Sequence, residues 1–444
     1  MENADVVVVG GGLAGLSCAM ELTLAGRGVV LLEEREVLGG RTSSWEDGGM
    51  EVESGLHRMI GYYKELPRLL RLAGIDVNDI VHWEDEFEVR LPDGTPPAVM
   101  GASPLFRPLK TVGSAIGNND FLSPMDKAGL ARFFTAGLLQ FAGDAESLDL
   151  QTVGQHARAN GVSEEAIGRM LVPLTTGLFF ISPDEYSAYA FFGLLAPGIR
   201  RFHRIRVGAF TGGMTDVMAD PIAGAVRAKG GSVETGAPVD GLLMDGYRVN
   251  GVTIAGRELR ARHVVLATGL GPAQDLLKGP FGEDAWFGPM LRLPTMPAVT
   301  AQFELDSPAL PVDRTTFGPG TVLASFSEQS RTTFSNRPGR LSVILARQDE
   351  FINVKASRIV EKVVEDAAKL GMDIRPHITD YRVTRLPRDF YSLRPGNNRM
   401  RPRQATPIPG LTLAGDYTRQ PMLATMEGAV ISGRLAAEAV LKAG

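Results

Sequence analysis

The stretch Asp5-Val6-Val7-Val8-Val9-Gly10-Gly11-Gly12-Leu13-Ala14-Gly15 decides the fold of this 444-residue chain. Its four valines are an apolar run typical of a short strand that is buried on both faces. Three glycines follow at GxGxxG spacing, and apolar residues then recur at helical intervals as far as Leu24. A second apolar strand, Val29–Leu32, ends in Glu33. A strand, a glycine turn, a helix and a second strand in this order predict a Rossmann-like unit that binds a dinucleotide.

Dinucleotide binding explains the residue types in this unit. Gly10 permits the tight turn, Gly12 lets backbone N–H groups approach a pyrophosphate, and Gly15 lets the helix pack closely on the strand. The N-terminus of the helix presents its partial positive charge to the phosphates. Glu33, at the end of the second strand, can accept hydrogen bonds from the adenosine ribose hydroxyls.

The residues after Glu33 distinguish a flavin from a nicotinamide cofactor. Glu33-Glu34-Arg35 is followed by Leu38-Gly39-Gly40-Arg41, which resembles the second half of the FAD signature of amine-oxidase-type proteins. In that signature the arginine reaches back to the cofactor phosphates, and a planar guanidinium suits bidentate phosphate contacts. The alternative is a glycine-rich turn with a solvated arginine. NAD-linked Rossmann domains lack this extension, so the sequence favours FAD.

Composition excludes several classes of protein. Apolar residues make up 44% of the chain and charged residues 22%, as in ordinary globular proteins. A net charge of −5 gives no reason to expect nucleic-acid binding. Cys18 is the only cysteine, so we expect no disulfide framework, no CxxC redox pair and no cysteine zinc site; nor does the sequence suggest another metal site. The sequence shows no secretory signal and no segment long enough to span a membrane. We therefore expect a cytoplasmic protein, with peripheral membrane contact as an open alternative.

The pattern of strands and helices predicts an α/β protein with a discontinuous FAD-binding domain. We assign residues 1–60, 205–270 and 405–444 to this domain, and residues 61–204 and 271–404 to an inserted α+β domain that binds substrate. Ligands are expected at the junction, beyond the carboxyl ends of the parallel strands.

Within these pieces the sequence predicts several further elements. They are hairpins near 45–53 and 86–100, helices near 63–74, 214–228, 355–371 and 426–441, and strands near 232–235, 239–244, 247–254, 263–268, 298–305, 341–346 and 411–416. Proline- and glycine-rich connections are expected over 270–297.

Residues 104–204 are expected to be mainly helical, with many aromatic side chains. Most of these aromatics are predicted to be core, and the alternative is that some line an apolar channel. A basic cluster follows at Arg200, Arg201, His203, Arg204 and Arg206. Such a cluster could place the mouth of a channel on anionic lipid headgroups.

A second cofactor motif lies near the end of the sequence. Leu413-Ala414-Gly415-Asp416 reads as a strand that delivers a carboxylate to ribityl or phosphate-linked hydroxyls. Thr425-Met426-Glu427 begins a helix whose free N–H groups can stabilise negative charge on N1 and O2 of a reduced flavin. The alternative for Glu427 is a capping carboxylate at a helix N-terminus.

Both motifs resemble the FAD-dependent amine-oxidase superfamily, and the C-terminal one resembles its plant- and cyanobacterial-type phytoene desaturases. The segment Gly55-Leu56-His57 with Gly61 and Tyr62 is similar to the Gly-Leu-His-x-x-x-Gly-x-Tyr segment of that branch, whereas Arg58-Met59-Ile60 departs from its usual apolar-aromatic residues. The resemblance implies that Val239 meets the adenine through its backbone and that His57 lies near the isoalloxazine. There His57 acts either as an acid or base or as a packing residue.

The sequence therefore predicts an FAD-dependent oxidoreductase. The first hypothesis is desaturation of an apolar isoprenoid, such as a carotenoid precursor, with quinone or oxygen reoxidising a non-covalently bound flavin. The alternatives are an amine oxidase, a redox-neutral polyene isomerase or hydroxysqualene dehydroxylase, and a non-catalytic flavoprotein. The candidate catalytic residue is His57. The residues expected to bind the cofactor are Gly10, Gly12, Leu13, Ala14, Gly15, Glu33, Glu34, Arg35, Gly40, Arg41, Gly55, Leu56, His57, Val239, Thr268, Gly269, Gly415, Asp416, Thr425, Met426 and Glu427.

Overall fold

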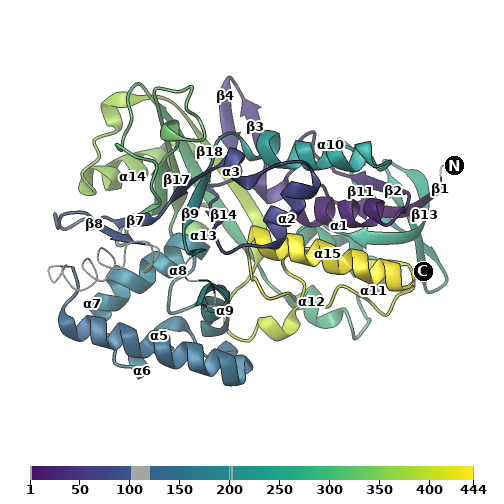
Figure 1. Ribbon diagram of the computed structural model, residues 1–444, viewed down its shortest axis with the longest axis horizontal. Coiled ribbons are helices and arrows are strands. Elements are labelled where there is room, and N and C mark those ends of the chain that lie inside the picture. Colours follow the sequence, from purple (N-terminus) through teal and green to yellow (C-terminus); the bar gives the residue numbers. More distant parts are fainter. Residues whose placement is uncertain (1–2, 102–120, 200, 202–203, 444) are drawn as a thin grey trace.

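Two large sheets carry the fold of the computed structural model, which describes residues 3–101, 121–199, 201 and 204–443. One sheet holds the N-terminal valine strand, and the second lies beside it with its own hydrophobic core. Figure 1 shows the first sheet near both chain termini, and the second sheet toward the opposite end of the molecule. A group of helices from the middle of the chain lies below the second sheet in this view.

The first sheet has the order β10-β2-β1-β13-β12-β11, and β19 also pairs with β13. Strands β10, β2, β1, β13 and β19 run parallel, and β11 and β12 form an antiparallel extension. The valines of β1 are buried because strands cover both edges and helices cover the faces. The strand bounds are β1 Asn3–Val9, β2 Val29–Leu32, β10 Ser232–Glu234, β11 Val239–Asp245, β12 Arg248–Ile254, β13 Arg257–Leu266 and β19 Leu411–Leu413.

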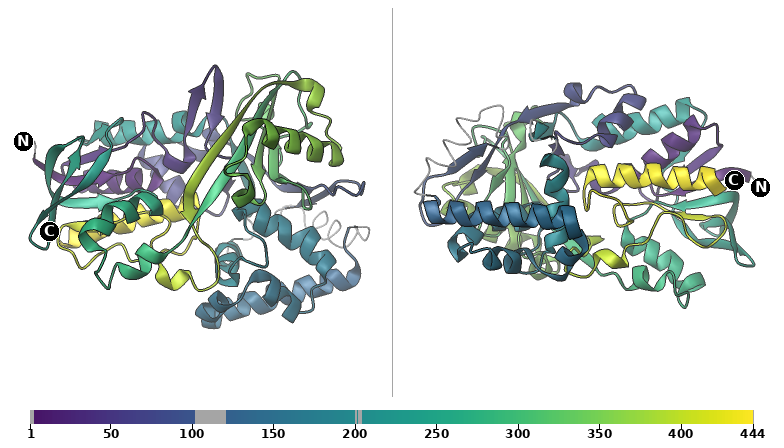
Figure 2. Two further views of the ribbon diagram at one scale, coloured as in Figure 1. Left: turned by 180° about the vertical axis from the view of Figure 1, so that it is seen from behind. Right: turned by 60° about the horizontal axis from the view of Figure 1, so that its bottom comes forward.

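Three helices far apart in the sequence pack together beside this sheet. They are α1 (Leu13–Leu24), α10 (Asp220–Ala228) and α15 (Met426–Ala443). Figures 1 and 2 show the C-terminal helix α15 running alongside the N-terminal helix α1. The two approach closely because Gly433 lacks a side chain, and a Cβ there would overlap the carbonyl oxygen of Ala14. The hydroxyl of Ser17 donates to the carbonyl of Val430 at 2.9 Å, which fixes their register.

The second sheet has the order β18-β14-β17-β16-β15-β7-β8. Its core includes Val299, Phe303 and Leu341 from the strands, and Ile359 and Val363 from helix α14. Strands 298–305 and 341–346, the 86–100 hairpin and helix 355–371 are confirmed as β14, β17, β7–β8 and α14. The bounds are β7 Glu86–Val89, β8 Ala98–Gly101, β14 Thr295–Leu305, β15 Thr316–Phe317, β16 Leu323–Glu328, β17 Gly339–Leu345, β18 Ile378–Tyr391, α13 Gln348–Phe351 and α14 Ala356–Lys369.

Smaller elements connect the two sheets. The predicted 45–53 hairpin is β3 (Ser44–Asp47) with β4 (Met50–Glu53). A three-stranded antiparallel sheet has the order β5-β9-β6, and helices α2 and α3 lie next to it in the chain. The bounds are β5 Met59–Ile60, α2 Glu65–Leu72, α3 Val77–Ile80, β6 Val81–Glu84 and β9 Val207–Phe210.

The aromatic helical region folds as α5 to α9. Phe133, Phe191 and Phe192 are buried and contact one another, with ring centroids 5.2–5.8 Å apart. The expectation that most aromatics are core is therefore confirmed for these residues. Of the predicted region, residues 104–120 and 200, 202 and 203 lie outside the described residues. The bounds are α5 Pro124–Asp144, η2 Ala145–Leu150, α6 Val153–Ala159, α7 Glu164–Ala166, η3 Ile167–Leu171, α8 Val172–Phe179 and α9 Ala188–Ile199.

The expectation of open connections over 270–297 is wrong. Helices α11 (Leu270–Phe281) and α12 (Gly288–Arg292) occupy most of this segment. Pro272 stands in the first turn of α11, where its missing N–H has no helical acceptor, and Pro280 falls in the last turn. Across the part of the chain that the structure describes, no helix is both long and apolar enough to cross a bilayer.

A substitution at Gly15 tests the close packing that the first motif requires. A Cβ at this position would overlap the carbonyl oxygen of Gly10, so Gly15→Ala must push α1 away from β1. We expect overpacking to destabilise the protein by about 1–3 kcal/mol. Gly224→Ala is the matched control, because Gly224 is exposed in helix α10 and no atom lies within 4 Å of the position that its new methyl group would take. A melting temperature unchanged in Gly15→Ala would contradict the packing argument.

Candidate active site

Two glycine-rich loops meet at the carboxyl end of β1. Gly12 and Gly39 form a parallel bridge, and the N–H of Gly39 donates to the carbonyl of Gly11 at 3.0 Å. A Cβ at Gly12 would have no neighbour nearer than 3.9 Å, so space remains above this backbone. Helix α1 begins here without a side-chain cap, and Leu13 and Ala14 are its first residues. The loops thus form a backbone-lined cradle at a helix N-terminus, which suits a pyrophosphate.

The buried side chain of Glu33 supports this cradle through hydrogen bonds to its backbone. One carboxylate oxygen accepts a hydrogen bond from the N–H of Gly11 at 2.6 Å, and the other accepts one from the N–H of Arg35 at 3.1 Å. Burial raises the pKa of Glu33, and these two bonds oppose that shift. The neighbouring Glu34 is exposed, and Arg35 lies over the Trp45 ring with its carbon Cζ 4.8 Å from the centroid. The ribose contact of Glu33 stays a prediction.

Arg41 and Asp416 bring the two cofactor motifs together. Arg41 donates to Asp416 at 2.5 Å, which joins residues that are 375 positions apart in the chain. The second carboxylate oxygen of Asp416 is buried and has no hydrogen-bond partner in the described structure. Leaving such an oxygen unpaired is unfavourable, so a ligand hydroxyl fits this position well. The structure thus brings the two motifs together, and the N–H of Gly415 donates to the hydroxyl of Ser432. The contact of Arg41 with the cofactor phosphates stays a prediction.

Sequence reasoning missed three residues beside this ion pair. Burial raises the pKa of Asp389 to about 6. The nearby charge of Arg41 lowers this pKa, and the charge of Asp416 raises it. Arg401 is buried and donates to the carbonyls of Asp416 and Tyr417, which shapes the loop after Asp416. The hydroxyl of Tyr391 accepts from the N–H of Ala424, whose φ is +51°. Their positions depend on strand β18 and the long-range packing around it, so no local motif marks them.

His57 adjoins the same region. Its Nδ1 lies 2.9 Å from the carbonyl oxygen of Gly55, which favours the tautomer with a proton on Nδ1. Burial lowers its pKa to about 4, and the positive charge of Arg41 acts in the same direction. The imidazole is therefore neutral at physiological pH, and Nε2 is its acceptor atom. Such a weakly basic imidazole favours the packing alternative over a strong general base.

The start of α15 provides free backbone donors. The side chain of Thr425 accepts from the N–H of Gly428 at 3.0 Å, whereas the N–H groups of Met426 and Glu427 have no acceptor among the described residues. The Glu427 carboxylate is engaged elsewhere: it accepts from the N–H groups of Lys64, Glu65 and Leu66 at 2.7–2.9 Å. The capping alternative for its side chain is confirmed, but the helix that it caps is α2. Only its backbone remains a candidate for the flavin.

Several of the other predicted residues lie beside the cradle, whereas Gly55 faces Thr300 and Ile344 of the second sheet. The turn before Val239 is hydrogen-bonded to the end of β2, because the N–H of Ala237 donates to the carbonyl of Glu33 at 2.8 Å. Thr268 follows β13 and lies between Gly10 and Gly415, since a Cβ on either glycine would contact its backbone. Gly269 precedes helix α11. Gly40 adjoins Gly12, while Gly55 and Leu56 precede His57.

Comparison with known proteins assigns the family. The model of flavin-containing amine oxidoreductases matches residues 13–441. The chain belongs to this family. As a flavin-containing amine oxidoreductase it is an FAD-dependent oxidoreductase.

Similar proteins cover nearly the whole of this oxidoreductase. A 15-cis-phytoene desaturase of an Oncidium hybrid cultivar is 29% identical, over 99% of this chain and 78% of its own length. The 15-cis-phytoene desaturase of Synechococcus elongatus is 27% identical, over 98% of this chain and 95% of its own. A double mutant of putrescine oxidase, redesigned in its cofactor binding, has a TM-score of 0.73 at 18% identity and covers 99% of both chains. This last likeness shows a shared fold.

The residues of the site fit FAD. The open space at Gly12, at the N-terminus of α1, would hold a pyrophosphate, and the unpartnered Asp416 oxygen would accept a hydrogen bond from a hydroxyl. In the family the flavin, when bound, supplies the redox chemistry. Cys18 lies fully buried on α1, where burial raises its pKa, so the single cysteine is not placed to anchor a flavin covalently. No group of metal ligands occurs in the described ranges.

Replacing Glu33 tests its predicted contact with the ribose. We expect Glu33→Ala to weaken FAD binding about tenfold or more, because a hydrogen bond to a charged acceptor contributes about 1.5–3 kcal/mol. The matched control is Glu34→Ala, which removes the adjacent exposed carboxylate. FAD titration of the apoprotein measures the affinity, and melting curves without cofactor report the loss of the Gly11 and Arg35 bonds. Equal affinities of Glu33→Ala and the parent would remove Glu33 from the cofactor site.

Proposed function

We propose that this oxidoreductase desaturates a hydrophobic isoprenoid, such as a carotenoid precursor of the phytoene type. The observation that carries the proposal is the similarity to 15-cis-phytoene desaturases along 98–99% of the chain. Because it spans almost the full chain, the similarity includes the central regions as well as both cofactor motifs. In the proposed reaction, the substrate would lose a hydride to N5 of the flavin and a proton from the adjacent carbon to water, so that a C=C bond forms between the two carbons.

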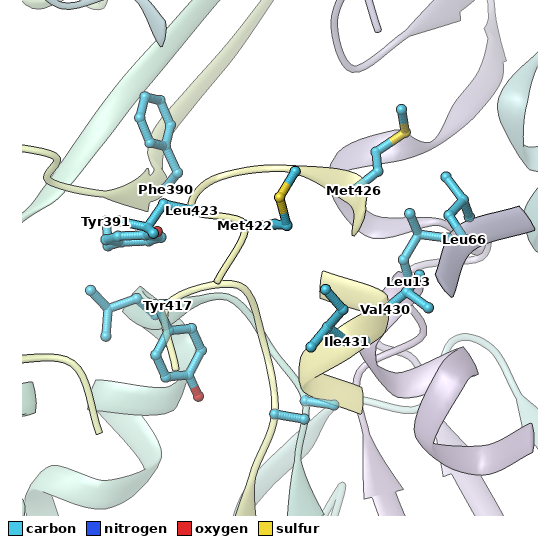
Figure 3. Packing of buried hydrophobic residues seen from close by; sticks show 14 of the residues in the cluster. Leu13, Leu66, Phe390, Tyr391, Tyr417, Met422, Leu423, Met426, Val430 and Ile431 are labelled. Carbon is cyan, nitrogen blue, oxygen red and sulfur yellow. The ribbon is translucent and has the colours of Figure 1, made fainter. Parts of the chain in front are cut away.

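Apolar side chains beside the cofactor motifs support this substrate class. They come from the end of β18 and from the loop that leads to α15, and Figure 3 shows them around that loop. The residues are Phe390, Tyr391, Tyr417, Met422, Leu423 and Met426. All six are buried, so the region is dry, and a polyene that entered beside them would be held by burial of apolar area rather than by polar contacts.

His57 has a limited part in this proposal. Its neutral imidazole would pack beside the reacting centre and present Nε2 as a hydrogen-bond acceptor. Loss of hydride from an allylic carbon leaves a delocalised cation, whose remaining proton is acidic. A strong base is therefore not required, which agrees with a pKa of about 4.

An amine oxidase is the second candidate. Tyr417 favours it, because this buried tyrosine has a hydroxyl without a hydrogen-bond partner in the described structure, as an aromatic residue facing a ligand would have. No lysine is among the residues that the described structure brings to Arg41 and Asp416. The isomerase and dehydroxylase alternatives share the same apolar surroundings and differ in the absence of net electron transfer.

Peripheral membrane contact belongs to the same proposal, with quinone or oxygen as electron acceptor. A polyene dissolves in lipid, so its enzyme gains access at a membrane surface. Four large apolar side chains are exposed on the central helical region, which is unfavourable in water unless something covers them. They are Met125, Leu139, Leu150 and Leu178.

The division into domains is also proposed. The first sheet with α1, α10 and α15 would bind FAD, and the second sheet with α5 to α9 would bind substrate. The position of helix α2 in the sequence places it in the substrate domain, yet the helix packs against α10 and α15. We therefore propose that residues 61–74 extend the FAD-binding domain.

His57→Ala tests the role of the imidazole. Because a neutral imidazole with a pKa of about 4 is a weak base, we expect the single-turnover rate of flavin reduction to fall less than about tenfold. The parent rate should also show no ionisation of His57 between pH 6 and 9. Flavin absorbance after gel filtration checks that FAD stays bound. A fall of about 10²–10⁴-fold with FAD in place would instead identify an acid or base.

Anaerobic stopped-flow mixing tests the substrate class. The FAD-loaded protein is mixed with phytoene-like polyenes in liposomes and, separately, with soluble primary and secondary amines. We expect polyenes alone to bleach the flavin absorbance, because they transfer hydride. Bleaching by amines alone would establish the amine oxidase. Turnover of a polyene without any transient bleaching would establish a redox-neutral isomerase.

A further inference from the structure

A cavity of about 700 Å³ lies outside the proposed flavin site. Its wall comes from the segment after His57, from α2 and α3, from β6 and from the residues before β9. None of the residues predicted to bind the cofactor lines it. Its size falls within the range of sites that bind small molecules.

The cavity is strongly basic. Six of its lining side chains are cationic and one is acidic, although the whole chain has a net charge of −5. The acidic residue, Glu65, is already paired with Arg68 and Arg434. The cationic residues are Lys64, Arg68, Arg71, Arg201, Arg204 and Arg206.

Half of these cations have no carboxylate beside them. Of the others, Arg201 acts on the carboxyl group of Glu427, whose pKa its positive charge lowers against the effect of burial. Arg68 pairs with Glu21, but the side chains of Lys64, Arg71 and Arg204 make no ion pair or hydrogen bond with any described residue. Arg201 donates to the backbone carbonyl of Tyr62 at 3.2 Å. Lys64, Arg71 and Arg204 are exposed, so water solvates them, but together they give the cavity a positive potential that favours an anion.

An aromatic residue holds one of the cations in place. The guanidinium of Arg206 lies 4.0 Å from the ring centroid of Trp83, which orders the side chain before any ligand binds. Burial lowers the pKa of Arg206, and the charge of Arg204 adds to this while Asp85 opposes it. Met59, Pro67 and Val77 supply apolar wall next to these charges.

We propose that this cavity binds the phosphate or diphosphate group of a small molecule or of a lipid headgroup. Arginine side chains form bidentate contacts with phosphate oxygens, and several cations around one cavity match a group with two or more negative charges. The apolar wall would contact the organic part of the ligand. This inference is independent of the proposed desaturation.

The first test measures binding of inorganic pyrophosphate to the FAD-loaded protein by titration calorimetry. We expect Arg71→Gln with Arg204→Gln to weaken binding at least about tenfold, because each lost hydrogen bond to phosphate is charge-assisted. Both arginines are exposed and unpaired in the described structure, so flavin absorbance and melting temperature should be unchanged. Arg358→Gln is the matched control, since Arg358 is an exposed arginine on α14.

Tryptophan emission locates the binding. The chain has three tryptophans, and only Trp83 lines the cavity. Pyrophosphate should change the emission of the FAD-loaded parent, and Trp83→Phe should abolish that change. A change retained in Trp83→Phe would place the anion elsewhere and overturn the proposal.

The second test separates the two sources of phosphate. Flotation at 150 mM salt compares vesicles of pure phosphatidylcholine with vesicles that also contain phosphatidic acid. If the parent binds pyrophosphate and the double substitution weakens that binding, the ligand is a free phosphate compound. If the parent binds vesicles only when they contain phosphatidic acid, and both arginines are needed, the ligand is a lipid headgroup. The proposal is overturned if the parent binds neither probe, or if the double variant binds as tightly as the parent.

Discussion

The close turn between β1 and α1 is the constraint on which the rest of the structure depends. Gly10 adopts a φ of +110°, and a Cβ there would lie 2.8 Å from the carbonyl oxygen of Ala267, the residue that follows the neighbouring strand β13. Gly15 lets the first turn of α1 pack against the carbonyl oxygen of Gly10 and the side chain of Ala267. The helix N-terminus is thereby held over the end of the central strand. Every other element of the cofactor site is placed relative to this point.

The C-terminal elements α15 and β19 add the second half of the cofactor site to this turn. Helix α15 packs on α1 through Gly433, and β19 joins the first sheet beside β13, which places Asp416 against Arg41. Glu427 then attaches α2 to the start of α15 through three backbone hydrogen bonds. Burial raises the pKa of this carboxyl group to about 7, so the three hydrogen bonds lie largely out of contact with water. The flavin region and the basic cavity beside α2 therefore share one rigid wall.

The elements that can be predicted correctly from the sequence are those whose pattern is local. A valine run, a glycine turn and a helical repeat need no distant partner to be recognised, and the Gly-Asp and Met-Glu-Gly motifs are similarly compact. Strand β18 escapes prediction because it contains five charged residues and Pro387. Pairing with β14 makes it a strand, and the proline falls at an irregularity of that pairing on the sheet edge. Asp389 and Tyr391 escape prediction with it. The partner of Glu427 is equally hidden, since a carboxylate near one helix start gives no sign that it caps another helix.

The parallel pairing of β1 with β13, and of β13 with β19, has a consequence for biosynthesis. A ribosome delivers β1 well before β19, and Asp416, three residues after the end of β19, emerges about four hundred residues later than β1. Until then the face of α1 that receives α15, including Ala14 and Ser17, has no cover. Apolar surface that stays uncovered during synthesis is prone to aggregation. The ion pair between Arg41 and Asp416, with the unpartnered oxygen beside it, therefore forms only after almost the whole of this sequence has been synthesised.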